Sequence, residues 1–109
     1  MQYTTLGRTG LQVSRICLGM MGFGAPAWRP WILGELEARP LVRRAIELGI
    51  NFFDTADTYS AGESEILAGK FMREFGQRED FVIASKVYNP VSMAFTSGQD
   101  PVSKSLPKK

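Results

Sequence analysis

The sequence contains no histidine, so it lacks the side chain that most often serves as a base near neutral pH or as a metal ligand. Cysteine is nearly absent as well. The single Cys17 excludes an internal disulfide. Because Cys17 lies in the apolar run ICL at residues 16–18, we expect it to be buried and to pack as a small hydrophobic side chain.

A strong net charge and a long apolar run are also missing. Lys and Arg number 13 against 11 Asp and Glu, a formal charge of +2, and part of this excess lies at Lys104, Lys108 and Lys109. So small an excess predicts neither a nucleic-acid partner nor a membrane-binding surface. The sequence shows neither an apolar leader nor a run long enough to span a bilayer, so we expect a cytoplasmic protein.

What the chain does contain is an alternation of short apolar runs and amphipathic segments. Two short alternating segments around Gly7 and Gly10 predict a β-hairpin. A long loop rich in Gly, Pro and aromatic residues is predicted at residues 20–36. Three strands are predicted by apolar runs at residues 15–19, 50–53 and 81–86, and two helices by periodic segments at residues 37–48 and 64–76. This order indicates an α/β fold with a parallel sheet.

The same pattern predicts helix ends, helix faces and a domain boundary. Pro40 suits the first turn of the first helix, and Ser64 is a suitable N-cap for the second. The chain becomes rich in Pro and Ser after residue 88, which predicts one domain at residues 1–88 and an irregular tail at residues 89–109. The residues expected to face inward are Leu41, Val42, Ala45, Ile46 and Leu48 in the first helix, and Ile66, Leu67, Phe71 and Phe75 in the second.

Residues whose side chains could take part in catalysis follow the predicted strands. In parallel α/β proteins the functional groups gather at the C-terminal ends of the strands. Gly19, Asp54 and Lys86 end the three predicted strands, and Tyr59 lies in the loop after the second. If neighbouring strands pair in order, Asp54 and Lys86 lie side by side with Tyr59 above them.

A tyrosine, a lysine and an aspartate in one place suit the reduction of a carbonyl group. A phenol with a pKa of about 10 is a poor proton donor at neutral pH unless its surroundings favour the phenolate. A neighbouring ammonium has this effect, and a carboxylate keeps that ammonium charged and oriented. The hydride would come from a cofactor, because no side chain supplies one.

Two segments carry a resemblance to a known family. GINFFDTADTYSAGESEILAG (residues 49–69) and REDFVIASKV (residues 78–87) resemble the aldo-keto reductase family, whose pattern is a strand ending in Asp-Thr-Ala-x-x-Tyr, then Gly-x-Ser-Glu, and a later strand ending in Lys. The opening YTTLGRTGLQVSRICLGMMGFG (residues 3–24) resembles that family's hairpin and first strand, so the resemblance covers residues 1–88. The Trp-rich AWRPWIL (residues 27–33) is similar to an insertion in a bacterial subgroup.

This resemblance implies a (β/α)8 TIM barrel. A complete barrel takes about 250 residues, so the chain would hold a truncated form with the N-terminal hairpin, three strands and two helices. The resemblance also implies NADP as cofactor, in the form of NADPH with NADH left open, and a small carbonyl compound as substrate. Asp54, Tyr59 and Lys86 match three members of the family's catalytic tetrad, whereas the fourth, a histidine, has no counterpart. Gly19 and Met20, with Asp54, match the stretch that lies against the nicotinamide.

Other residues leave alternatives open. The acidic residues that crowd the loop after the second strand could suggest a metal site, but we expect them to cap a helix and to be solvated, with no metal bound. These are Asp57, Glu63 and Glu65. The aromatic residues of the long loop either line a substrate pocket or cover the surface. These are Phe23, Trp28 and Trp31.

Three functions follow from the sequence: an aldo-keto reductase, a non-catalytic remnant of one, and a small α/β binding module. Because the histidine and most of a barrel are missing from the 109 residues, we expect the chain by itself not to reduce carbonyls. An isolated three-stranded parallel sheet leaves two exposed edges, so we also expect self-association through those edges.

Overall fold

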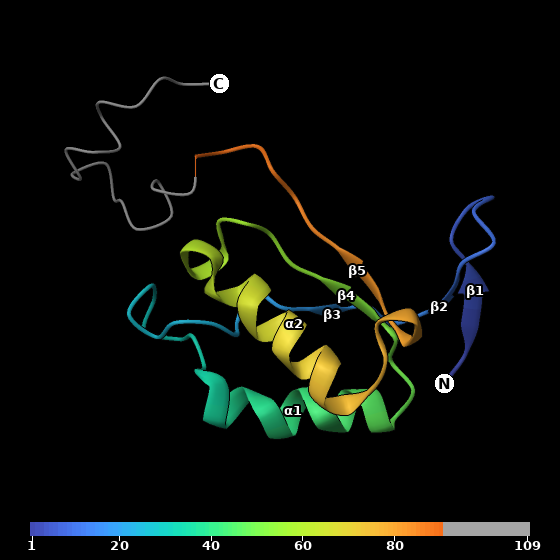
Figure 1. Cartoon of the computed structure of the whole chain (residues 1–109), viewed down its shortest axis with the longest axis horizontal. Helices are drawn as coiled ribbons and strands as arrows, with labels where there is room; N and C mark the ends of the chain where they lie inside the picture. Colours follow the sequence, from blue (N-terminus) through green and yellow to red (C-terminus); the bar gives the residue numbers. More distant parts are fainter. Residues whose placement is uncertain (91–109) are drawn as a thin grey trace.

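The computed structural model describes residues 1–90, and the predicted tail beyond residue 90 lies outside the described residues. A hairpin comes first, and helices and strands then alternate (Figure 1). The strands are β1 (Tyr3–Thr5), β2 (Gln12–Ser14), β3 (Leu18–Gly19), β4 (Phe52–Asp54) and β5 (Val82–Ala84). The helices are α1 (Glu35–Glu47) and α2 (Glu63–Phe75), and two short 3-10 turns, Tyr59–Gly62 and Arg78–Asp80, precede α2 and β5.

The strands form two small sheets whose pairing confirms the predicted fold class. β1 and β2 pair antiparallel, while β3, β4 and β5 form a parallel sheet in sequence order. Gly19 pairs with Asp54, and Asp54 pairs with Ala84, so the C-terminal ends of all three parallel strands meet at one edge. The hairpin lies beyond the opposite ends of these strands (Figure 1).

Both helices pack on one face of the parallel sheet (Figure 1). Each helix contributes an apolar stripe to a common core with residues of β4 and of the segments next to the strands. The buried residues of this core are Met20, Ala38, Val42, Phe53, Leu67, Ala68, Phe71, Met72 and Phe81. Among residues 1–90, no helix is both long and apolar enough to cross a membrane.

The predicted helix faces are partly wrong. In α1 the buried residues are Ala38, Val42 and Ala45, whereas Leu41 and Leu48 are more than half exposed. In α2 the predicted Leu67 and Phe71 are buried, but Ile66 is 57% exposed. Each helix touches the sheet and the other helix along a narrow line, so only part of its apolar stripe is covered.

The predicted start of the first helix is also wrong. The helix begins at Glu35, where the Ala38 amide donates to the Gly34 carbonyl oxygen at 2.9 Å, so Pro40 lies in the second turn rather than the first. Proline has no amide hydrogen, and one hydrogen bond of the helix is therefore missing there. The exposed position of Pro40 keeps this irregularity out of the core.

Cys17 is exposed and free, which corrects the prediction of a buried thiol. Cys17 lies just before β3, outside the strand, whereas the neighbouring Leu18 packs against the core. Partial burial raises the pKa of the Cys17 thiol, the Asp54 carboxylate raises it further, and the Lys86 ammonium opposes the rise.

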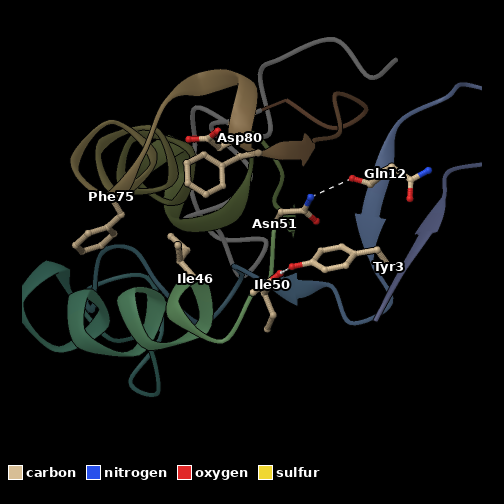
Figure 2. Close-up of a pocket in the computed structure, with 9 residues that line it drawn as sticks. Tyr3, Gln12, Ile46, Ile50, Asn51, Phe75 and Asp80 are labelled. Atoms are coloured by element: carbon tan, nitrogen blue, oxygen red, sulfur yellow. Dashed lines mark hydrogen bonds between the residues drawn. The ribbon is translucent and has the colours of Figure 1, made fainter. Parts of the chain in front are cut away.

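The hairpin is fastened to the parallel sheet by Asn51, the residue just before β4. Its side-chain oxygen accepts from the Ser14 amide at 2.7 Å, and its side-chain nitrogen donates to the Gln12 carbonyl oxygen at 3.0 Å. The Tyr3 hydroxyl donates to the Gly49 carbonyl oxygen at 2.6 Å. Figure 2 shows the hydrogen bonds of Asn51 with Gln12 and of Tyr3 with Gly49 beside a cavity of about 450 Å³ between the hairpin and the helix ends, away from the C-terminal edge of the sheet.

Four charged residues join α1 to α2. Glu35 accepts hydrogen bonds from Arg39 of its own helix and from Lys70 of α2, and Arg39 also pairs with Glu74 of α2 at 3.0 Å. The hydrogen bond from Lys70, and then that from Arg39, lowers the pKa of the Glu35 carboxyl below its ordinary value. A lowered pKa in the folded state stabilises the protein above the ordinary pKa, and this stabilisation is lost as the pH falls through the folded-state value.

We therefore expect Glu35→Gln to flatten the dependence of stability on pH in the acidic range. The wild-type chain should lose more stability than the variant between about pH 6 and about pH 3, as measured by urea midpoints. Glu47→Gln is the matched control, because Glu47 pairs only with exposed arginines of its own helix in the described structure. An equal acid sensitivity of the wild type and Glu35→Gln would contradict the role given to this network.

Candidate active site

The three residues predicted to end the strands do meet at one edge of the sheet, but Lys86 is not part of a strand. β5 ends at Ala84, two residues earlier than predicted. The chain nevertheless continues beside the segment after β4, because the Thr55 amide donates to the Ala84 carbonyl oxygen at 2.8 Å and the Asp57 amide to the Lys86 carbonyl oxygen at 3.2 Å. This backbone pairing keeps Lys86 next to Asp54.

The Lys86 ammonium is the centre of the site. It donates to both oxygens of the Asp54 carboxylate, at 3.1 and 3.2 Å, and to the Tyr59 hydroxyl oxygen at 3.2 Å. A further hydrogen bond of 2.8 Å reaches the Thr55 carbonyl oxygen, a backbone group that no motif in the sequence distinguishes. The fold thus brings Asp54, Tyr59 and Lys86 together around one ammonium group.

The charges of this trio favour the ammonium form of Lys86. Burial alone lowers the pKa of Lys86, but the hydrogen bonds and charges of Tyr59 and Asp54 together raise it above its ordinary value. The Lys86 side chain is 50% exposed and the Asp54 side chain 42% exposed. An ion pair with this much solvent contact contributes little to the stability of the fold.

The Tyr59 ring lies between the ammonium and an aromatic residue of the long loop. The Lys86 nitrogen is 4.8 Å from the centre of the Tyr59 ring, and the Trp28 ring centre is 6.3 Å from the Tyr59 ring centre. Trp31 meets Trp28 edge to face, yet Trp31 is 54% exposed. Phe23 instead packs against the hydrophobic core. Of the three aromatic residues considered from the sequence, Trp28 therefore borders the site directly.

Two of the residues predicted to contact a cofactor, Gly19 and Met20, differ in their exposure to solvent. Gly19 is exposed beside its strand partner Asp54, and a side chain at Gly19 would meet no atom within 4 Å. Met20 has its side chain fully buried in the core, while its amide donates to the Asp54 carbonyl oxygen at 2.8 Å. The cofactor contacts of Gly19, Met20 and Asp54 stay predictions.

Ser64 is not the N-cap of α2, since the helix begins at Glu63 after Gly62. Its buried hydroxyl donates to the Met20 carbonyl oxygen at 2.9 Å and lies 2.9 Å from the Thr55 hydroxyl. These bonds fasten the first turn of α2 to the segments that follow β3 and β4. A serine at the start of a helix resembles a cap in the sequence, and only the tertiary structure shows this buried role.

Two of the acidic residues near the site, Asp57 and Glu65, line one cavity with Lys86. Glu65 accepts a hydrogen bond from the Ser85 hydroxyl, and Glu63 is exposed in the first turn of α2. Within the part of the chain that the structure describes, no three His, Cys, Asp or Glu side chains are grouped as metal ligands. The carboxylate that lies among the candidate catalytic residues is that of Asp54.

Comparison with known proteins gives consistent relatives. The chain is 45% identical over 89 residues to versiconal hemiacetal acetate reductase of Aspergillus parasiticus, a match that covers 81% of this chain and 26% of that protein. It is 46% identical over 97 residues to the uncharacterized oxidoreductase YrpG of Bacillus subtilis, covering 84% of this chain and 28% of that protein. The chain thus spans little more than a quarter of the length of these relatives.

A solved structure shows the same arrangement of elements. The aldo-keto reductase of Bacillus halodurans, solved in a holo form, is 35% identical and superposes with a TM-score of 0.70 over 92% of this chain and 29% of that one. The hairpin, parallel strands and helices described above therefore correspond to the beginning of that TIM barrel. The sequence profile of the aldo/keto reductase family matches residues 15–108. The chain belongs to the aldo/keto reductase family.

Proposed function

We propose that the chain carries the proton-donating part of an oxidoreductase that reduces a carbonyl to an alcohol with NAD(P)H. The observation that supports this most is the pair of hydrogen bonds from the Lys86 ammonium to the Tyr59 hydroxyl and to the Asp54 carboxylate. Membership of the aldo/keto reductase family points to small carbonyl compounds as the substrate class. The cytoplasmic location expected from the sequence stays a prediction.

In this proposal Tyr59 is the general acid. Its hydroxyl proton passes to the carbonyl oxygen of the substrate as that oxygen gains negative charge. The phenolate that remains lies 3.2 Å from the Lys86 ammonium, which stabilises it by its charge. Asp54 holds the ammonium in place through both carboxylate oxygens, so that the lysine stays charged and aimed at the phenol.

The residues present fit the nicotinamide end of the cofactor. Because a side chain at Gly19 would meet no atom within 4 Å, the strand backbone beside Asp54 has open space above it. The flat nicotinamide ring could lie on this backbone next to Asp54. Gly19 and Asp54 would hold the nicotinamide there, and NADPH would supply the hydride when bound. The family typically uses NADPH.

The two alternatives from the sequence remain to be distinguished from this proposal. A non-catalytic remnant would keep the trio without binding a dinucleotide, and a binding module would use the same loops for another partner. Titration of the 109-residue chain with NADPH, followed by the fluorescence of Trp28 and Trp31, separates the first function from the other two. Trp28 is suited to report on binding because its ring lies beside that of Tyr59.

A chimera tests the catalytic part of the proposal. Residues 1–88 of this chain would replace the segment that aligns with them in versiconal hemiacetal acetate reductase, which then supplies the remainder of a barrel. We expect the chimera to consume NADPH with the substrate that the relative's name states, and the 109-residue chain alone to consume none. A well-folded chimera without activity would contradict the proposal.

A further inference from the structure

The three residues that follow Tyr59 adopt an unusual backbone. Ser60 and Ala61 have φ near 51°, and Gly62 has φ of 104°, so three consecutive residues lie in the left-handed region. Residues other than glycine rarely adopt this conformation, because the side chain approaches the following carbonyl oxygen. Contacts from elsewhere in the fold must therefore hold this turn, which connects Tyr59 to α2.

The segment that holds the turn is the loop after β3, at Gly24. Ser60 is fully buried, and within residues 1–90 its hydroxyl oxygen has no hydrogen-bond partner. A methyl group added at Gly24 would lie 2.6 Å from the Ser60 Cβ and closer still to its hydroxyl oxygen. Only a residue without a side chain leaves room for Ser60 at this point. The loop backbone thus lies directly on the serine side chain.

This contact joins the two segments that carry the aromatic rings of the site. Tyr59 immediately precedes Ser60, and Trp28 follows Gly24 in the same loop. Two backbone hydrogen bonds stiffen that loop: the Gly24 amide donates to the Leu33 carbonyl oxygen, and the Leu33 amide to the Gly22 carbonyl oxygen, each at 2.9 Å. A shift of Ser60 away from Gly24 would therefore move the Tyr59 ring relative to both Trp28 and Lys86.

We infer that the absence of a side chain at Gly24 leaves the room that Ser60 needs for the turn to place the Tyr59 phenol at the Lys86 ammonium. Gly24 and Ser60 are positioning residues, and their importance for catalysis rests on the proposed function. The left-handed turn aims Tyr59 at Lys86, and a side chain at position 24 would push Ser60 out of that conformation.

Nuclear magnetic resonance of the full 109-residue chain tests this inference without any enzymatic assay. The Lys86 nitrogen lies 4.8 Å from the centre of the Tyr59 ring, so the ring current should shift the ε-methylene proton signals of Lys86 from their free-chain positions. We expect Gly24→Ala to abolish most of this shift, together with the contacts between Trp28 and Tyr59 ring protons. Gly22→Ala is the matched control in the same loop, because a methyl group there would meet no atom within 4 Å.

A second substitution should rescue the first. Ser60→Gly removes the hydroxyl oxygen and the Cβ atom that the new methyl group would strike. The nearest remaining atom is then the Ser64 amide nitrogen, 3.5 Å from that methyl group. Glycine also adopts the left-handed conformation at position 60 without steric cost. We therefore expect Ser60→Gly alone to keep the Lys86 shift, and Gly24→Ala with Ser60→Gly to restore it.

Each outcome decides the inference. Loss of the Lys86 shift in Gly24→Ala with recovery in the double variant supports it, whereas an unchanged shift in a folded Gly24→Ala overturns it. Should Gly24→Ala fail to fold, the double variant decides in the same way: a folded chain with the shifted Lys86 signals supports the need for space between position 24 and the Ser60 side chain, and a chain without them contradicts it. An inactive chimera would count against the proposed function while leaving this result untouched.

Discussion

Tyr59→Phe in the chimera should lower kcat by about 10² to 10⁴-fold, the range found when a general acid is removed. The substitution deletes the hydroxyl that Lys86 approaches at 3.2 Å and keeps the ring that packs beside Trp28. KM should change little, because the lost interaction forms mainly in the transition state. Initial rates of NADPH consumption at several substrate concentrations measure both constants.

Two further variants distinguish the effect of losing the Tyr59 hydroxyl from effects of other changes in the chain. Tyr88→Phe removes a hydroxyl from a residue that is 73% exposed, and it should leave the rate unchanged. Lys86→Met should also slow the reaction strongly, since it removes the charge that would stabilise the phenolate. If Tyr59→Phe kept the rate of the parent chimera, Tyr59 would not be the proton donor and the central part of the proposed function would be lost.

The largest effect on folding is expected for Phe71→Ala. Phe71 is fully buried in the core, where its ring stacks on Phe75 with centres 6.1 Å apart. The Arg39 guanidinium lies 5.7 Å from the centre of the same ring, so Phe71 connects both helices. Truncation of a buried phenylalanine to alanine costs about 3–5 kcal/mol, a large part of the roughly 5–15 kcal/mol that stabilises a small domain.

Urea unfolding followed by circular dichroism measures this loss. Leu36→Ala is the matched control, because Leu36 also lies on a helix but is 84% exposed, and its replacement should change stability by less than about 0.5 kcal/mol. The titrations should be repeated at several protein concentrations, since self-association through the edge strands β3 and β5 would raise the apparent stability. Equal losses for both variants would show that Phe71 is not part of a cooperative core.

The candidate site was predicted from the sequence because its residues follow a local rule. Asp54 and Lys86 come at or just after the ends of apolar runs, and strands that pair in order place such residues side by side. The contact between Gly24 and Ser60 could not be predicted in this way. Nothing near either residue in the sequence indicates that the loop after β3 packs on the turn after Tyr59.

The errors about which residues are buried share one physical cause. A periodic pattern shows which residues are apolar, but it does not show which of them the fold covers. Leu41, Leu48 and Ile66 belong to apolar stripes and are nevertheless exposed, because the two helices and the sheet bury only part of each stripe. Cys17 likewise belongs to a short apolar run and is nevertheless exposed. Ser64, expected as a cap, instead bonds to Met20 across the fold.

The sequence by itself determined the order of hairpin, strands and helices, the parallel pairing, and the identity of Asp54, Tyr59 and Lys86 as the candidate site. These features depend on periodicity, glycine positions and motif spacing, which act over short distances along the chain. Only the tertiary structure decided what surrounds Tyr59, because the left-handed turn at Ser60 lies against Gly24 of a separate loop. Such contacts depend on how distant segments meet, which local patterns do not encode.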